Sequence, residues 1–133
     1  MNFDFSDDLK FLKEEARRFL SVVCPPAAVR ALLDDVEPGY DAGIWRSIVG
    51  QGWPGAWIPE NYGGLGLGHI ELCAIAEELG RAIAPVPFAS SVYLFAEALM
   101  MAGTEAQKAK LRRRRRHRDR MLRHQRRPRA DLC

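Results

Sequence analysis

Cysteine is scarce in this chain, which has only Cys24, Cys73 and Cys133 among its 133 residues. Their number is odd, they are widely spaced, and no Cys-x-x-Cys pair occurs. This pattern argues against a disulfide framework and against a zinc site, and it favours a reducing compartment. We expect Cys24 and Cys73 to behave as small hydrophobic residues buried in a core.

Long apolar runs are also absent. No stretch approaches the ~20 apolar residues that a membrane-spanning helix requires. The N-terminus begins with acidic helix signals instead of a signal peptide. We therefore expect a cytoplasmic protein that makes no membrane contact. The length suits one domain and is too short for two well-packed ones.

Lysine is missing from residues 112–133, where 11 arginines accompany only 2 aspartates. Residues 1–111 instead carry 9 Lys and Arg against 15 Asp and Glu. We therefore divide the chain into an acidic body and a basic tail, which we expect to be disordered. One interpretation of the tail is a frameshifted reading, because a GC-rich gene read out of frame yields arginine, alanine, proline and histidine. The other is a nucleic-acid arm, and nonspecific polyanion binding is expected in either case.

Hydrophobic periodicity in the acidic body predicts an all-α fold of five to six helices. Ser6 is a suitable N-cap for the first helix, and Pro25-Pro26 should end it and open a short second one. Asp41 should cap a third helix that closes at Gly50 or Gly52. The apolar face of the first helix is formed by Phe5, Leu9, Leu12, Ala16 and Phe19.

The second half of the body predicts three further helices. The fourth begins near His69, with Ile70, Cys73, Ile75, Ala76 and Leu79 facing inward and Glu71, Glu77 and Glu78 outward. Ser90 or Ser91 should cap a fifth helix that ends at Gly103 and is apolar on nearly every side, so it needs cover that this chain does not supply. Thr104 and Gln107 form a capping box that starts a sixth.

Between the third and fourth helices lies a stretch rich in glycine and proline, from Trp53 to Gly68. Proline fixes φ and glycine reaches positive φ freely, so this density of both is incompatible with a helix. Its tryptophans and aliphatic side chains favour burial, however, and a solvated linker would not carry them. We predict an ordered loop that folds back between packed helices.

No group of residues supports catalysis or metal binding. The run Gly63–Gly68 does not match Gly-x-Gly-x-x-Gly, and it lacks the Lys-Ser/Thr of a Walker loop, so we interpret it as a tight turn. His69 and Glu71 point to different sides of a helix and cannot act as a pair. Ser90 and Ser91 have no His-Asp arrangement that would activate them. We therefore assign no catalytic, cofactor-binding or metal-binding residue.

Several motifs of the body closely resemble the N-terminal helical domain of the FAD-dependent acyl-CoA dehydrogenases. The resemblance covers about residues 1–111, and the tail departs from it. Its most specific parts are Gly52-Trp53-Pro54, Pro59-Glu60-Asn61-Tyr62-Gly63-Gly64-Leu65-Gly66, Glu77-Glu78-Leu79-Gly80 and Gly103-Thr104-Glu105-Ala106-Gln107-Lys108.

The resemblance implies a chemistry that this chain would share only in part. Members of the family are three-domain flavoenzymes that take a proton and a hydride from Cα and Cβ of an acyl-CoA thioester. A carboxylate is the base, FAD accepts the hydride, and an electron-transfer flavoprotein receives the electrons. The family's catalytic glutamate and most FAD contacts belong to later domains. The resemblance therefore implies a truncated member that neither retains FAD nor turns over alone.

In the family, the N-terminal domain forms a wall of the acyl-chain cavity near the turn into the fifth helix. By position, the resemblance carries this role to Phe88, Ser91, Val92 and Phe95. Because the domain would bury apolar surface against domains that this chain lacks, we also expect self-association. Two other readings stay open: a small helical interaction module whose basic tail binds nucleic acid or other polyanions, and a non-functional gene product.

Overall fold

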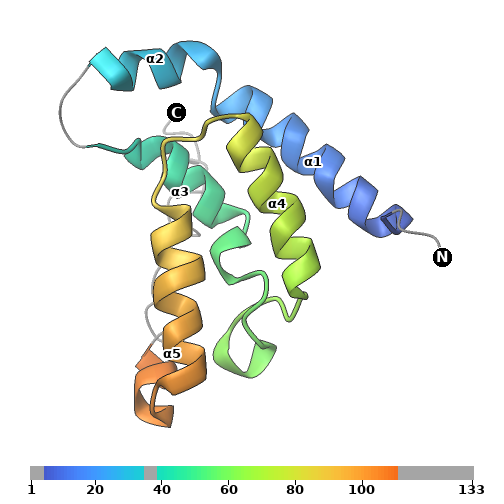
Figure 1. Ribbon diagram of the computed structural model, residues 1–133, viewed down its shortest axis with the longest axis vertical. Coiled ribbons are helices and arrows are strands. Elements are labelled where there is room, and N and C mark those ends of the chain that lie inside the picture. The colour runs from blue at the N-terminus through green and yellow to red at the C-terminus, as the bar shows by residue number, and fades with distance from the viewer. Residues whose placement is uncertain (1–4, 35–38, 111–133) are drawn as a thin grey trace, which may run out of the picture.

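The computed structural model describes residues 5–34 and 39–110, and the described chain is helical without any strand (Figure 1). Two short 3-10 turns, Trp53–Gly55 and Glu60–Tyr62, lie in the loop that precedes α4. Residues 105–110 form the start of a sixth helix. The longer elements are α1 (Asp7–Val23), α2 (Pro26–Asp34), α3 (Ala42–Gly50), α4 (His69–Arg81), η3 (Ala89–Ala96) and α5 (Glu97–Ala102), the last two being continuous. The all-α prediction is confirmed.

The helix ends form where the sequence places capping residues. The Ser6 hydroxyl accepts a hydrogen bond from Leu9 N at 3.3 Å, and the Asp41 carboxylate accepts bonds from the first turn of α3. These side chains satisfy backbone N–H groups that have no partner within the helix. Pro26 opens α2, as expected of a residue with a fixed φ. Thr104 and Gln107 bond each other's backbone N–H, which is the predicted capping box.

Helices α1 and α4 lie side by side and form the centre of the core (Figure 1). Leu20 from α1 and Leu72 and Ile75 from α4 are almost completely buried there. Phe88 and Val92 at the start of η3 close the same core from the other side. The remaining buried members of the cluster are Ala16, Cys24, Ile44, Ile48, Trp53, Ala56 and Leu79.

The loop Trp53–Gly68 is ordered and folded back on itself, as predicted. Leu65 N, Gly66 N and Leu67 N donate to the carbonyls of Gly55, Ile58 and Ala56, at 3.0, 3.0 and 2.7 Å. The two halves of the loop therefore hold each other by backbone bonds. Gly64 is required for this approach, because a Cβ there would lie 1.7 Å from Ile58 O.

The inward face of α4 differs from the predicted one. Ile70 and Cys73 are exposed, whereas Glu78 is completely buried. The burial of Cys24 is confirmed and that of Cys73 is wrong. The reason is that Leu72, Ile75 and Leu79 contact the core at helical spacing, which turns Ile70 and Cys73 away from it. Glu78 shares the buried side because arginines from two helices neutralise it.

The start of the fifth helix also differs from the prediction. The helix is wound before Ser90 and Ser91, and no side chain caps it. Ser90 Oγ instead donates to Pro87 O at 3.3 Å. At the other end, Gly103 follows α5 in an extended conformation. A Cβ on Gly103 would lie 2.3 Å from Leu99 O, so close approach and not positive φ calls for glycine here.

Within the described ranges, no helix is both long and apolar enough to cross a membrane. The boundary predicted at residue 111 and the Arg-rich tail, with its predicted disorder and polyanion binding, lie outside the described residues.

Candidate functional site

The segment Ala89–Ala96 (η3) is wound as a π-helix, which is rare and occurs often at functional sites. It follows the Pro85-Val86-Pro87 turn and continues directly into α5. In an α-helix, residues 88, 92 and 95 would share one face. The wider π winding advances each residue through a smaller angle, so the buried positions become Phe88, Val92 and Ala96.

This winding separates the four residues assigned to the acyl-chain wall. Phe88 and Val92 are buried in the core, and Ser91 is half-buried. Phe95 lies on the open side, with 62% of its surface exposed. The structure therefore divides the four into two that hold the helix in place and two that reach the surface.

Leu94, Phe95 and Met101 make the outer side of η3 and α5 apolar. Leu94 is 70% exposed and Met101 is more exposed still. In the residues described, nothing covers this surface. It matches the prediction that the fifth helix is apolar around most of its circumference.

Tyr93 fixes η3 against α4. Its hydroxyl donates to Leu72 O at 3.5 Å, and its ring meets Phe88 edge-on with 5.9 Å between centroids. Burial raises the pKa of the Tyr93 phenol, and the nearby Cys73 thiol adds to this. Tyr93 therefore stays protonated and keeps donating its hydrogen bond at neutral pH.

A second contact joins α4, the loop and α5. His69 packs its ring on Trp57 at 5.2 Å, and its Nε2 lies 3.5 Å from a carboxylate oxygen of Glu97. The indole Nε1 of Trp57 is buried and has no hydrogen-bond partner among the described residues. The cluster positions the open face of η3 and α5 relative to α4.

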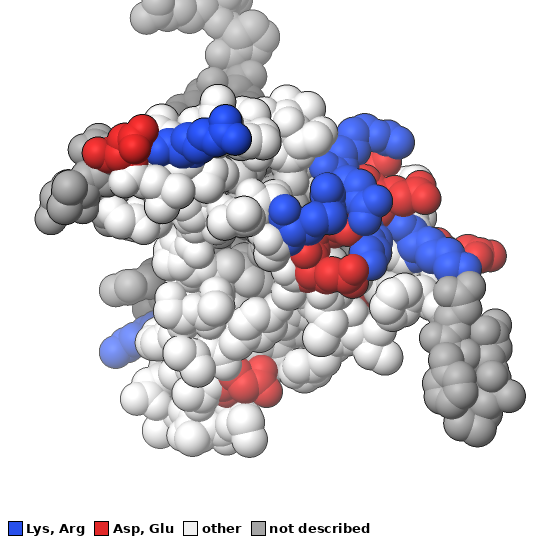
Figure 2. Space-filling view, turned by 45° about the horizontal axis from the view of Figure 1, so that its top comes forward, with Lys and Arg blue, Asp and Glu red and all other residues white. Residues whose placement is uncertain are grey.

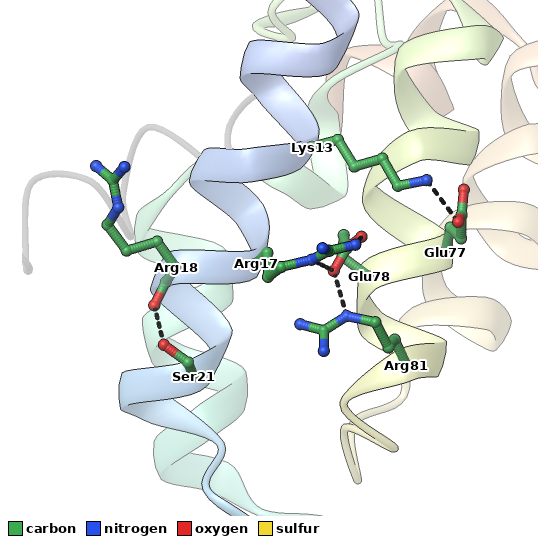
Figure 3. Close-up of polar contacts among 7 residues, drawn as sticks. All are labelled: Lys13, Arg17, Arg18, Ser21, Glu77, Glu78 and Arg81. Carbon is green, nitrogen blue, oxygen red and sulfur yellow. Dashed lines mark hydrogen bonds and ion pairs between the residues drawn. The ribbon is translucent and has the colours of Figure 1, made fainter.

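The most strongly perturbed carboxylate is Glu78, between α1 and α4 (Figure 3). Arg17 donates from Nε and Nη2 to its two oxygens at 3.1 and 2.8 Å, and Arg81 Nε donates at 2.7 Å. The hydrogen bonds from Arg17 lower the pKa of Glu78 to about 2, with Arg81 adding to them against the effect of burial. A carboxylate with so low a pKa is a poor base. We therefore assign Glu78 a structural role, which is to join α1 and α4.

Sequence reasoning missed the burial of Glu78, although a signal for it was present. Glu78 follows Ile75 by three residues and precedes Leu79, so it borders the apolar stripe of α4. Arg81 lies three residues further on, one helical turn away. The partner from α1, Arg17, could not be identified without knowing that the two helices pack together.

The glycine-rich loop is held by its own backbone hydrogen bonds. In the glycine-rich loop, the N–H groups of Gly64, Leu65, Gly66 and Leu67 all donate to carbonyls of the same loop, so they do not form a phosphate cradle. Among all the described residues, no three His, Cys, Asp or Glu side chains gather to hold a metal ion.

Residues 6–114 match the family model described as acyl-CoA dehydrogenase, N-terminal domain. The chain therefore belongs to the acyl-CoA dehydrogenase family, a family of flavoprotein oxidoreductases, through its N-terminal helical domain.

Curated relatives agree with this assignment. Over 78% of its length the chain is 33% identical to acyl-CoA dehydrogenase FadE27 of Mycobacterium tuberculosis, of which it covers 28%. Over 75% of its length it is 32% identical to acyl-CoA dehydrogenase IpdE2 of Mycolicibacterium smegmatis, of which it covers 32%. Mitochondrial isovaleryl-CoA dehydrogenase of Solanum tuberosum is 32% identical over 80% of the chain, which covers 26% of that enzyme. The chain thus spans about a third or less of the length of these relatives.

Two solved structures share the fold. A variant of the Tcur3481-Tcur3483 steroid ACAD superposes with a TM-score of 0.70 at 34% identity, over 80% of this chain and 29% of that one. The ChsE4-ChsE5 complex from Mycobacterium tuberculosis gives a TM-score of 0.71 at 29% identity, over 84% of this chain and 32% of that one.

Proposed function

We propose that this chain contributes one wall of the acyl-chain cavity of an FAD-dependent acyl-CoA dehydrogenase and does not dehydrogenate by itself. The observation that carries the proposal is the π-wound segment Ala89–Ala96, which points Phe95 and Leu94 outward. An exposed apolar surface on a family domain, beside a rare helix geometry, is suited to an acyl chain.

Within this wall, the four assigned residues have different roles. Phe88 and Val92 would fix the position of η3 by packing into the core. Phe95, with Leu94, would contact the hydrocarbon, and the half-buried Ser91 would border it. Changing Phe95 should therefore alter which acyl chains fit, whereas changing Val92 should mainly alter stability.

Hydride transfer requires a flavin held against Cβ and a base at Cα. The support for inactivity of this chain alone is that Glu78 is locked in ion pairs and that the N–H groups of the loop are used internally. The thioester substrate, FAD and an electron-transfer flavoprotein would act on an assembly with further domains. The ChsE4-ChsE5 neighbour is a complex, and we extend association to this chain as part of the proposal.

A chimera tests the wall. Residues 6–110 would replace the matching region of Solanum tuberosum isovaleryl-CoA dehydrogenase, and kcat/KM would be measured with acyl-CoA substrates of increasing length. We expect Phe95→Ala to shift the preference toward bulkier or longer acyl groups. Met101→Ala is the control, because Met101 is also a strongly exposed apolar side chain but lies outside η3. Identical length profiles for the parent chimera and Phe95→Ala would overturn the assignment.

A separate measurement tests inactivity. The purified 133-residue chain should show no flavin absorption in the visible blue and no acyl-CoA-dependent dye reduction after incubation with FAD. A yellow, redox-active preparation would contradict this part of the proposal. The wall assignment would not be affected, because the chimera tests it separately.

A further inference from the structure

An apolar hollow lies between the end of α1, helix α2 and the turn that follows α4. Its volume is about 480 Å³, in the range of small-molecule sites. Leu20 from α1, its C-cap residue Cys24 and Val29 from α2 line it, and Leu33 and Ile83 flank it. Its residues Val29, Leu33 and Ile83 also line a neighbouring hollow that reaches Phe88 and Tyr93. Leu33 is 79% and Ile83 73% exposed, so apolar surface continues from the floor to the rim.

The charged groups of the hollow suit an anion, whereas the Ser21 hydroxyl already donates to Arg18 O at 2.7 Å. Ser21, Arg30 and Arg81 line the hollow, and no acidic side chain of the described chain does so. Arg81 directs Nε toward Glu78, while its two terminal nitrogens point away from that carboxylate (Figure 3). Charged side chains otherwise gather over α1 and α4, and a broad uncharged face extends below α2 (Figure 2).

Ile83 adds an independent observation. Its φ is +49°, and it is the only non-glycine residue of the described chain with positive φ. Ile83 N donates to Gly80 O and Ala84 N to Leu79 O, both at 3.0 Å, which is the Schellman ending of a helix. Glycine is the usual residue at this position, and a β-branched one is strained there. The strained residue is thus an exposed apolar one at the edge of the hollow, and backbone strain of this kind clusters at functional positions.

We propose that this hollow binds an amphipathic monocarboxylate, that is, a fatty-acid anion. The hydrocarbon would lie along Leu20, Val29 and Leu33 under Ile83, and the carboxylate would meet Arg30 and the terminal nitrogens of Arg81. An inorganic anion would leave the apolar floor uncovered, and a neutral lipid would leave Arg30 without a counter-charge, whereas Arg81 is already paired with Glu78. The apolar floor and the arginines together favour a ligand that has both a hydrocarbon chain and a carboxylate.

The test uses the full chain and decanoate below its micelle concentration, with binding followed by titration calorimetry and by amide chemical shifts. Arg30→Gln should weaken binding about threefold, as expected for an exposed ion pair. Leu33→Gln should weaken it by a similar factor through lost apolar contact. Both side chains are exposed, so these variants should keep the fold.

Ile83→Gly provides a test that separates function from structure. It relieves the backbone strain, so the melting temperature should rise, yet the loss of the side chain should weaken decanoate binding about tenfold. A residue with a purely structural role would not raise stability and lower affinity together.

Matched controls are Arg46→Gln and Val22→Gln, two exposed changes outside the hollow that should leave the affinity unchanged. All variants keep the Arg-rich tail, so binding to the tail would be the same in each. Decyltrimethylammonium, with the opposite charge, should not bind. Equal decanoate affinity in the parent, Arg30→Gln and Ile83→Gly, or equal affinity for the cation, would overturn the proposal.

Discussion

Arg17 on α1 donates two hydrogen bonds to Glu78 on α4, at 3.1 and 2.8 Å, and the carboxylate that receives them is fully buried. A fork of this kind fixes the rotation and the height of one helix against the other. Lys13 and Glu77 form a second ion pair between the same two helices, nearer the surface. The two helices that build the core are thus joined by charge as well as by apolar packing.

Because of the Arg17–Glu78 ion pair, the free energy of unfolding should depend on pH. The pKa of Glu78 falls from 4.5 to about 2 on folding, so the unfolded chain binds a proton more readily than the folded one. The stabilisation is fully present above about pH 5 and is lost as the pH falls toward 2. Because both arginines are half-exposed, we expect Glu78 to contribute about 2 kcal/mol to the free energy of unfolding at pH 7. This is less than its full pKa shift implies. Urea unfolding at pH 7, 4 and 2.5 measures it.

The control for this prediction is Glu78→Gln, which keeps the shape and removes the titrating group. It should be less stable at pH 7, and the loss of stability between pH 5 and 2.5 should be smaller in it than in the parent. The same pH dependence in both chains would show that other carboxylates cause the acid sensitivity.

Gly64→Ala should destabilise the chain by about 3 kcal/mol or prevent folding, because Cβ would overlap Ile58 O and separate the two halves of the loop. Gly80→Ala is the matched change. Nothing lies within 4 Å of a Cβ at Gly80, which is helical, so alanine should stabilise by about 0.5–1 kcal/mol. Thermal melts of the two variants should shift in opposite directions.

The two described cysteines should differ in reactivity. Burial raises the pKa of the Cys24 thiol, with the charge of Asp41 adding to it, and the side chain is 4% exposed. Cys73 is exposed on α4. In a Cys133→Ser chain, one equivalent of a thiol reagent should therefore react quickly at Cys73, and the second only on unfolding. Fast reaction of both thiols in the folded chain, located by peptide mass mapping, would contradict this.

The open face of η3 and α5 should cause self-association. Sedimentation velocity should show concentration-dependent oligomers that decrease in a Leu94→Gln/Phe95→Gln double variant, because less apolar surface is then exposed. Phe11→Gln/Val22→Gln is the matched control, since these two α1 side chains are equally exposed. If the control pair reduces association as much as the η3 pair, the interface lies elsewhere.

Much of the fold could be predicted because its signals are local. Ser6, Pro26, Asp41 and the Thr104–Gln107 box each act within one helical turn, and each ends or begins a helix as expected. The composition of the glycine-rich loop alone predicts that it is ordered. The six-residue range 105–110 confirms that another helix starts after Gly103.

The rest depended on information that a single helix does not contain. The burial of Glu78 requires Arg17, which is distant in sequence, and the outward turn of Cys73 follows from how α4 meets the core. The π winding of η3 rotates Phe95 relative to Phe88, and no periodicity in the sequence announces it. The role of the wall residues follows from resemblance and stays a prediction.

One hydrogen bond links the glycine-rich loop to the helix that starts at residue 105. The Tyr62 hydroxyl donates to Glu105 at 2.7 Å, and Lys108 adds an ion pair to the same carboxylate at 3.3 Å. The glycine-rich loop is thereby tethered to the opening turn of the sixth helix. Inserting or deleting a residue in the loop would consequently displace residues 105–110 relative to α4.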